Sequence, residues 1–299
     1  MNAVNNLIVN FTKILPKSVV YIFAKKYVAG NTLEKAVEVV KDLNSKGIAA
    51  TMDVLGESIE TKEEAISAKT ECLKVLDAIE EHQLNSNLSI KPTQMGLEIE
   101  RDFGYETISE IVKKAKELKN FVRIDMEDSS VTQATIDMFK KLQDEFGNVG
   151  IVLQAYLRRT MEDVKDLNKL GTNYRLCKGI YVEPEKIAYK GRREVQDNFM
   201  NSLELMLDNG NYVGIATHDD YLVEEAYKMI KEKNISKEKF EFQMLYGVKE
   251  NLRDKINADG YKIRVYVPFG EQWYPYSMRR LQENPELAWY ITKSIFTKN

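Results

Sequence analysis

Two adjacent arginines near the C-terminus, Arg279 and Arg280, are the side chains best suited to bind an anionic substrate. They lie in a stretch with helical spacing, where neighbouring side chains project about 100° apart and can approach one carboxylate from different sides. Each guanidinium also presents a fork of N–H donors that matches the two carboxylate oxygens. The alternative is an exposed ion pair between Arg279 and Glu283, which stands four residues later.

The overall charge of the chain does not attract an anion, so a local cluster of cations such as these arginines must bind it. The 299 residues carry a formal net charge of -3, so the chain lacks the basic surface of a nucleic-acid-binding protein and its overall field does not attract anions. Cys72 and Cys177 are too few for a disulfide framework and are expected to be reduced thiols in a cytosolic protein. With only His82 and His218 beside them, no metal site is predicted.

Several common site motifs are absent from the sequence. No two glycines are separated by a single residue, which excludes the Rossmann fingerprint, and no glycine precedes a lysine, which excludes a P-loop. The G-x-S-x-G elbow of the α/β-hydrolases is also missing. A dinucleotide, if one binds, must therefore bind by another route.

Strand-like runs alternate with helix-like runs along most of the chain. The predicted strands cover 47–56, 87–93, 121–127, 149–157, 173–179, 211–218, 239–247 and 261–270. The predicted helices cover 61–83, 106–119, 131–146, 160–170, 193–208, 220–233, 249–258 and 273–283. Eight such units in a chain of this length predict a closed (β/α)8 TIM-type barrel of the α/β class. A doubly wound open sheet is the alternative fold.

The domain organisation follows from the same pattern. No stretch rich in Gly, Ser or Pro interrupts the chain, so we expect one catalytic domain over 1–299. Within it, N-terminal helices cover 1–45 and the barrel covers 46–299. No apolar run is long enough to cross a membrane, and the amphipathic residues 1–30 are expected to pack on the domain as a helix.

Polar and apolar residues separate on the two sides of the predicted strands. Alternate strand residues face the same side, and Arg123 and Asp125 share one side of the third strand while Ile124 and Met126 share the other. Other polar sets of a single side are Asp53 with Glu57, Ser89 with Lys91 and Thr93, Glu241 with Gln243, and Arg264 with Tyr266. We expect the apolar side to face the helices and the polar side to face the barrel axis. Because unpaired axial polar groups cost free energy, these residues predict an active site at the C-terminal ends of the strands.

Three longer stretches near the predicted strand ends carry a family resemblance. They are RLCKGIYVEP (175–184), EFQMLYGV (241–248) and RVYVPFGEQWYPYSMRRLQE (264–283). Shorter stretches in the same order are DVLGE (53–57), SIKPT (89–93), RIDMED (123–128), QAYLRR (154–159) and IATHD (215–219). Together they resemble proline dehydrogenase, in its monofunctional bacterial form, from about residue 47 to 290.

The resemblance implies a flavoenzyme. Its expected cofactor is FAD at the open end of the barrel, and its expected substrate is L-proline, which is oxidised to 1-pyrroline-5-carboxylate. Hydride would pass from proline C5 to flavin N5, and the electrons would pass on to a quinone. The implied location is the cytoplasm, with peripheral contact to the inner face of the bacterial membrane, for which the amphipathic residues 1–30 are one candidate surface.

The resemblance also implies roles at the substrate. Lys91, Arg279 and Arg280 would bind the proline carboxylate, with Glu283 in the same region. Glu57 would pair with Arg279 and gate the site, although it could instead cap the next helix. Apolar and aromatic side chains would surround the proline ring and exclude water; they are Tyr181, Leu245, Tyr266 and Tyr276.

The implied flavin contacts come mainly from the fourth to seventh strands. Arg175, assigned as catalytic together with Tyr181, would donate near flavin N5 and stabilise negative charge on the reduced ring. Lys178 would meet the pyrophosphate, and Gln154 the polar rim of the isoalloxazine. The remaining assigned contacts are Asp125, Gly179, Thr217, His218, Gln243 and Met244.

Some of these residues have alternative interpretations. Asp125 either orients the flavin contacts or is a structural carboxylate paired with an axial cation. His218 could be a satisfied core histidine. Asp219 and Met244 depart from the family pattern, where Asn and a basic residue are expected, and both bear on cofactor affinity.

Two other functions remain open from the residues alone. A barrel carbon–carbon lyase would use Lys91 or Lys178 to form an imine, which requires an amine with a depressed pKa. A flavoprotein without turnover would bind the cofactor and never be reduced by proline.

Overall fold

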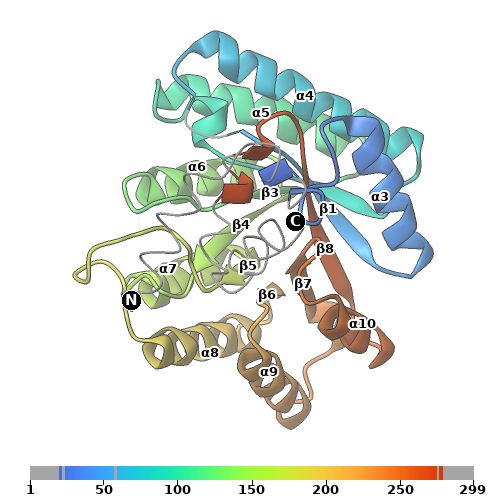
Figure 1. The fold of residues 1–299 in the computed structure, drawn as a ribbon. Coiled ribbons are helices and arrows are strands. Elements are labelled where there is room, and N and C mark those ends of the chain that lie inside the picture. Colours follow the sequence, from blue (N-terminus) through green and yellow to red (C-terminus); the bar gives the residue numbers. More distant parts are fainter. Residues whose placement is uncertain (1–19, 22–23, 57–58, 275, 279–299) are drawn as a thin grey trace, which may run out of the picture.

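Eight parallel strands close into a barrel, as the alternating pattern predicts (Figure 1). The computed structural model describes residues 20–21, 24–56, 59–274 and 276–278. Each strand pairs with the next along the chain, and the last strand pairs with the first. The strands are β1 (Ala49–Val54), β2 (Ser86–Ile90), β3 (Val122–Ile124), β4 (Val149–Gln154), β5 (Asn173–Cys177), β6 (Tyr212–Ala216), β7 (Phe240–Leu245) and β8 (Ile263–Phe269).

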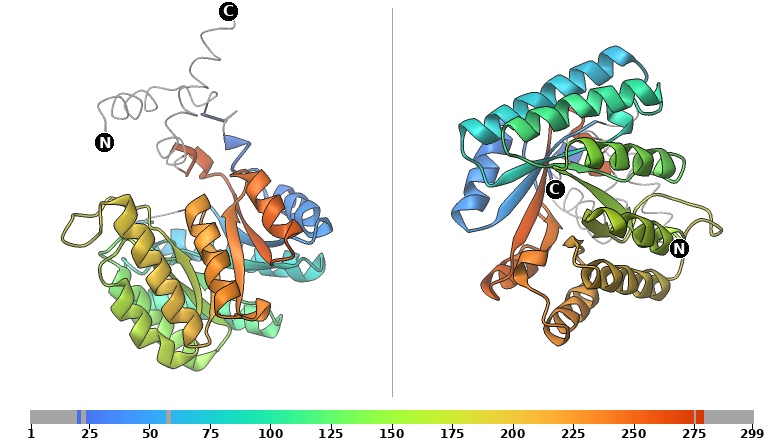
Figure 2. Two further views of the ribbon diagram at one scale, coloured as in Figure 1. Left: turned by 90° about the horizontal axis from the view of Figure 1, so that it is seen from below. Right: turned by 180° about the vertical axis from the view of Figure 1, so that it is seen from behind.

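The helices form an outer layer around the strands (Figures 1 and 2). They are α3 (Leu33–Ser45), α4 (Lys62–Glu81), α5 (Arg101–Glu117), α6 (Thr132–Glu145), α7 (Thr160–Leu167), α8 (Arg192–Asp208), α9 (Asp220–Glu232) and α10 (Glu250–Ala258). Short 3-10 turns add η1 (Thr93–Met95), η2 (Asn168–Leu170) and η3 (Lys237–Lys239). Each of α4 to α10 connects two consecutive strands, which is the crossover that parallel neighbours require.

The helix before the barrel covers the seam between the last and first strands. α3 packs against both β1 and β8, which confirms a helical segment ahead of the barrel. The helix predicted from residue 273 does begin there, because 273–274 and 276–278 are helical. Its Tyr276 packs with Tyr27, Val28 and Leu55, and this segment lies beyond one end of the barrel, red at the top of the left view (Figure 2). That end is where the strands finish, and we call it the mouth.

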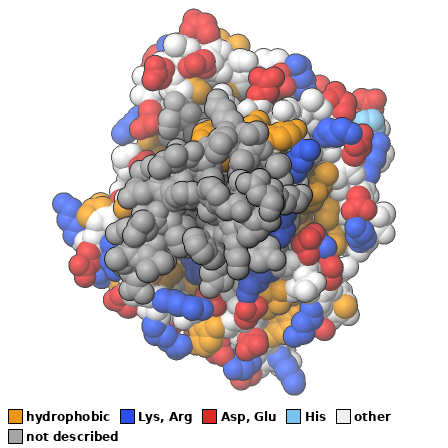
Figure 3. Space-filling view, in the orientation of Figure 1, with side chains coloured by type: hydrophobic (Ala, Val, Ile, Leu, Met, Phe, Trp, Pro, Cys, Tyr) orange, Lys and Arg blue, Asp and Glu red, His pale blue; other side chains and the backbone are white. Residues whose placement is uncertain are grey.

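The surface around the mouth mixes both signs of charge. On the face in Figure 3, Lys and Arg side chains are interspersed with Asp and Glu toward the edge of the molecule. Val182 and Ile180, in the connection between β5 and α8, are among the large exposed apolar side chains. None of the helices in the described ranges is both long and apolar enough to span a bilayer.

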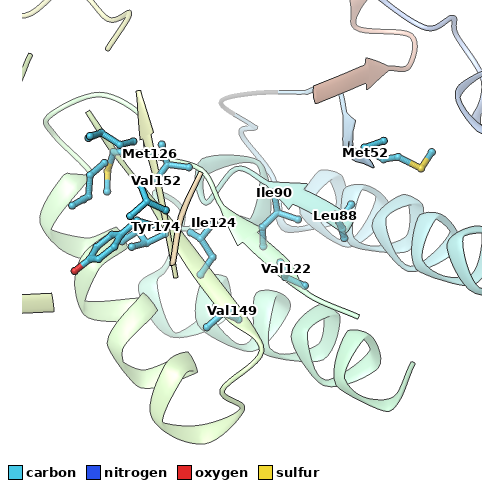
Figure 4. Close-up of a cluster of buried hydrophobic side chains, with 14 of the residues drawn as sticks. Met52, Leu88, Ile90, Val122, Ile124, Met126, Val149, Val152 and Tyr174 are labelled. Carbon is cyan, nitrogen blue, oxygen red and sulfur yellow. The ribbon is translucent and has the colours of Figure 1, made fainter. Parts of the chain in front are cut away.

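The apolar side of each strand packs under the helices, as predicted. Met52, Leu88, Ile124 and Val265 are fully buried in one continuous cluster with the inner faces of the helices, and Figure 4 shows part of it. Burying each such side chain contributes about 1.5–3 kcal/mol. This cluster holds the strands in place around the barrel axis.

The polar side of the strands faces the axis, but not all of it faces the mouth. Asp53, Lys91 and Asp125 lie at or just beyond the C-terminal strand ends, because β2 ends at Ile90 and β3 at Ile124. The interpretation that all the axial polar residues mark the active site is wrong for three of them. Arg123, Glu241 and Arg264 line a cavity at the opposite end of the barrel. They sit earlier on their strands, so the barrel carries two separate polar layers.

Glycine makes room for axial side chains on neighbouring strands. A Cβ atom on Gly150 would lie 2.5 Å from the carbonyl oxygen of Asn173 and 2.6 Å from the ring of Phe121, and it would also collide with the Arg123 guanidinium. On Gly214 it would collide with the amide of Gln243. Neither strand could carry a side chain there without displacing an axial polar residue.

Gly150→Ala should therefore destabilise the protein by about 3 kcal/mol, because the new methyl group meets backbone and a packed ring that cannot move away. Gly147→Ala is the matched control: its Cβ meets nothing within 4 Å, and its φ of +75° costs about 1 kcal/mol. Denaturant unfolding of both variants measures the difference. Equal losses would show that the Arg123 guanidinium does not depend on space over Gly150.

Candidate active site at the mouth of the barrel

Arg175 is held rigidly in the centre of the barrel, below the mouth. It projects from β5 toward the axis and is buried. Its Nε donates to Gln243 Oε1 at 2.6 Å, and its Nη1 donates to Asp125 Oδ1 at 2.8 Å. The ring of Tyr266 lies against the guanidinium, with 5.2 Å between Cζ and the ring centroid. These contacts fix both the position and the plane of the cation.

Asp125 joins three strands through its carboxylate. Oδ1 also accepts from Ser89 Oγ at 2.7 Å, and Oδ2 accepts from the hydroxyl of Tyr266 at 2.9 Å. The two interpretations of Asp125 therefore merge: it is a buried carboxylate paired with an axial arginine, and by that pairing it orients Arg175.

Lys91 forms a buried ion pair with Asp53. Its Nζ lies 2.8 and 3.0 Å from the two carboxylate oxygens and 3.5 Å from the hydroxyl of Tyr266. Asp53 is only 1% exposed; burial raises the pKa of its carboxyl, while Lys91 opposes that rise. The sequence placed Asp53 among the polar residues that face the barrel axis, but it did not assign Asp53 a role or a partner.

Tyr266 connects the two ion pairs. Its hydroxyl contacts Lys91 on one side and Asp125 on the other. Burial raises its pKa well above the usual value, and the carboxylates of Asp125 and Asp53 raise it further. The phenol therefore stays protonated and acts as a hydrogen-bond donor. Lys91, Asp125, Arg175 and Tyr266, all predicted site residues, lie in one connected cluster.

Comparison with known proteins assigns this cluster to a family. The Proline dehydrogenase family model matches residues 36–289. Proline dehydrogenase 1 of Bacillus subtilis is 40% identical over 275 residues, which cover 92% of this chain and 91% of that protein. The chain belongs to the proline dehydrogenase family. The family resemblance of the sequence motifs is thereby confirmed.

Two further relatives agree with this assignment. Proline dehydrogenase of Deinococcus radiodurans is 35% identical over 286 residues, covering 94% of this chain and 92% of that protein. A crystal structure of proline utilization A from Bdellovibrio bacteriovorus, inactivated by N-propargylglycine, matches with a TM-score of 0.82 and 27% identity. That match covers 88% of this chain and 33% of the longer relative. An imine-forming lyase is not supported by these matches, and Lys91 and Lys178 each lie in an ion pair.

Proline dehydrogenases use FAD, and the donors around the mouth fit such a cofactor. Lys178 directly follows β5, which ends one residue earlier, and is partly exposed. Gln154 is fixed by donating from Nε2 to the carbonyl oxygen of Glu127 at 2.8 Å. Cations near the rim suit a pyrophosphate, and a buried guanidinium suits an electron-accepting ring. These residues come from adjacent strands at one end of the barrel.

Gly179 has a structural reason to be glycine. Its φ is +109°, and a Cβ there would collide with the ring of Tyr156. The backbone after β5 can therefore turn closely over Tyr156, carrying Lys178 to the rim. Contact between Gly179 and the flavin stays a prediction.

Asp219 forms an ion pair with Lys178, the lysine predicted to bind the pyrophosphate. Its Oδ2 lies 3.2 Å from Lys178 Nζ and accepts from Gln196 Nε2 at 3.1 Å, while Arg192 lies 3.4 Å from Oδ1. Burial would raise the pKa of Asp219, but Gln196, Lys178 and Arg192 together hold it below the usual value. Arg192 and Gln196, at the start of α8, were missed because no strand motif marks them.

His218 and Thr217, just before Asp219, accept hydrogen bonds from backbone N–H groups of the protein. His218 Nε2 accepts from the backbone N–H of Leu245 at 2.9 Å, which matches its alternative as a satisfied histidine. Thr217 Oγ1 accepts from the backbone N–H of Asp219 at 3.1 Å. The expectation that Met244 lines the cofactor is wrong, because Met244 is buried in the cluster under the helices. Gln243, on the opposite side of β7, faces the axis below Arg175.

The remaining predicted substrate contacts lie near the mouth or outside the described residues. Leu245 ends β7, and Tyr181 lies in the connection between β5 and α8. Tyr276 is buried beside Leu55, and it contributes to the raised pKa of Tyr266. Four predicted residues lie outside the described ranges: Glu57, Arg279, Arg280 and Glu283.

The lowered pKa of Asp219 predicts a pH-dependent contribution to stability. A carboxyl with a lowered folded pKa stabilises the fold above its unfolded pKa, and that stability is lost as pH falls through the folded value. Asp219→Asn should cost about 1–2 kcal/mol at pH 7, and the deficit should shrink below about pH 4. Asp220→Asn, which removes an exposed pair with Lys249, should change stability by under about 0.5 kcal/mol. A deficit for Asp219→Asn that is independent of pH would contradict the assignment.

Proposed function

We propose that this chain oxidises L-proline to 1-pyrroline-5-carboxylate with bound FAD, as the first step of proline breakdown. The observation that carries the proposal is the convergence of Lys91, Arg175 and Tyr266 on two buried carboxylates at the mouth of the barrel. When bound, FAD supplies the acceptor, flavin N5, for a hydride from proline C5. The residues of the chain bind the substrate, orient it and exclude water.

Lys91 supplies a fixed cation for the proline carboxylate. Asp53 holds its ammonium from one side, so the side chain loses little further freedom when the substrate binds. Arg279 and Arg280 add two guanidinium groups from the segment that follows Met278. Glu57 gates this cluster by pairing with Arg279, and Glu283, four residues after Arg279 in the sequence, belongs to the same region.

Aromatic and apolar side chains enclose the proline ring. Tyr266 lies between Lys91 and Arg175, so its ring forms the floor between the carboxylate site and the flavin site. Tyr181, Leu245 and Tyr276 form the walls. Excluding water strengthens the electrostatic contacts and favours close approach of the reacting atoms.

Arg175 stabilises the electron-rich reduced flavin. Its guanidinium is positioned by Asp125 and Gln243 before the cofactor binds, so little reorganisation is needed. Lys178 turns from Asp219 to the pyrophosphate, and Gln154 meets the polar rim of the ring. Gly179, Thr217 and His218 complete the cofactor site.

A quinone is the proposed electron acceptor. A quinone dissolved in a bilayer requires contact with the membrane surface, so we place the protein in the cytoplasm with peripheral contact at the inner face of the membrane. The amphipathic residues 1–30 are the candidate surface. Redox-dependent sedimentation with liposomes tests this contact.

The visible absorption spectrum tests the activity itself. Anaerobic L-proline should bleach the flavin band of the purified protein, because the two electrons removed from proline reduce the cofactor. D-proline, whose carboxylate cannot reach the same cations with the ring in place, should leave the band unchanged. A flavin band that persists with L-proline would contradict the proposed substrate, and no flavin after reconstitution with FAD would contradict the cofactor assignment.

Substitution of the paired arginines tests the carboxylate site. Arg279→Lys and Arg280→Lys each keep the charge but lose the fork of donors, so each should raise the KM for L-proline at least about tenfold. Flavin content should stay at the wild-type level. Arg193→Lys on α8, whose exposed side chain pairs with Asp197, is the control and should leave KM unchanged. Wild-type KM values in both arginine variants would refute the assignment.

A further inference from the structure

A polar cavity lies at the end of the barrel opposite the mouth. Its volume is about 440 Å³, which is enough for a small ligand. The loops that enter β2 and β3 and the first residues of β5 and β6 surround it. Its charged and aromatic lining residues are Lys119, Phe121, Arg123, Tyr212, Glu241 and Arg264.

The charge of this cavity is unbalanced. Three cations, Lys119, Arg123 and Arg264, line it against the single carboxylate of Glu241. That carboxylate is already occupied, because Oε1 accepts from Arg264 Nε at 2.6 Å and from Gln243 Nε2 at 2.7 Å. Burial alone would raise the pKa of Glu241, but Arg264 and its hydrogen bonds lower it. Glu241 therefore remains ionised and forms an ion pair with Arg264.

Arg123 is a buried cation that, among the described residues, donates hydrogen bonds only to neutral acceptors. It is 2% exposed, and its terminal nitrogens donate to Asn173 O at 2.6 Å, Asn173 Oδ1 at 2.5 Å and Ile151 O at 3.3 Å. Its Nε has no hydrogen-bond partner among the described residues. Burial and the charges of Arg175 and Arg264 lower its pKa to about 9, although the negative charge of Glu241 opposes this shift. Burying the charge of an arginine this deeply is costly, and neutral acceptors offset only part of that cost.

Arg264 and Lys119 also have N–H donors that no other described residue uses. Arg264 uses Nε for Glu241 and Nη1 for the carbonyl oxygen of Ala50, so its Nη2 makes no hydrogen bond to any residue in the described ranges. Lys119, exposed at the rim, has no ion pair within the same ranges. The ring of Phe121 lies against the Arg123 guanidinium, 4.9 Å from its Cζ to the centroid. Guanidinium groups beside a flat wall match the planar oxygens of a small anion.

We propose that this cavity binds a small oxyanion, either a carboxylate or inorganic phosphate. The anion accepts hydrogen bonds from Arg264 and Lys119 and adds negative charge to a cavity in which three cations face one carboxylate. Phe121 and Tyr212 form its apolar walls. This site is separate from the substrate site at the mouth, and it does not depend on the proposed function.

Calorimetric titration of the purified, flavin-containing protein tests the proposal. The probes are acetate and inorganic phosphate, each titrated separately at constant ionic strength against a chloride background. Saturable binding of either probe is expected, and which probe binds more tightly identifies the source of the oxyanion. Binding should persist in the presence of L-proline, because that ligand occupies the other end of the barrel.

Variants assign the binding to this cavity. Lys119→Gln removes an exposed cation that makes no buried contact, and it should weaken binding about tenfold, the loss of one charge-assisted contact. Lys113→Gln, an exposed lysine outside the cavity on α5, is the matched control and should bind as the wild type does. Arg264→Gln should abolish binding; if that variant does not fold, Lys119→Gln decides the question. Heats that do not saturate, or equal binding by Lys119→Gln and wild type, would overturn the proposal.

Discussion

The ion pair between Arg175 and Asp125 is the interaction on which the architecture of the mouth depends. A barrel that places charges on its axis must pair each of them, because an isolated buried charge is far more costly than a hydrogen-bonded pair. Asp125 accepts from Arg175, Ser89 and Tyr266, and these come from three other strands. The carboxylate thereby holds the strands in register at the end where substrate and flavin are expected.

The same chain of contacts continues down the axis. Gln243 accepts from Arg175 and donates to Glu241, which in turn accepts from Arg264. The two polar layers are thus joined by hydrogen bonds through one glutamine, Gln243. The upper layer uses its cations within ion pairs at the mouth, whereas the lower layer has more cations than carboxylates. That difference is the basis for the anion site proposed in the lower cavity.

The position of α3 explains how the mouth can be covered by chain beyond the last strand. Because α3 packs against β8 and β1 on the outside, the helix that begins at residue 273 is not needed on that wall. Its described part packs with Tyr27, Val28 and Leu55 at the mouth. Arg279 and Arg280, which are proposed to bind the substrate carboxylate, follow this part directly in the sequence.

The sequence by itself determined the barrel and the side of each strand that faces its axis, because the periods of strands and helices and the alternation of polar with apolar residues are local properties. The motifs also predicted Lys91, Asp125, Arg175 and Tyr266 as site residues, and the structure connects these four side chains by hydrogen bonds. Only the tertiary structure decided at which end of the barrel each axial residue lies, since parity fixes a direction and not a height, and Arg123, Glu241 and Arg264 sit in the lower layer. The sequence also could not show which charged side chains form ion pairs with one another. Asp53 pairs with Lys91, and Asp219 with Lys178, because the closed barrel brings separate strand ends together.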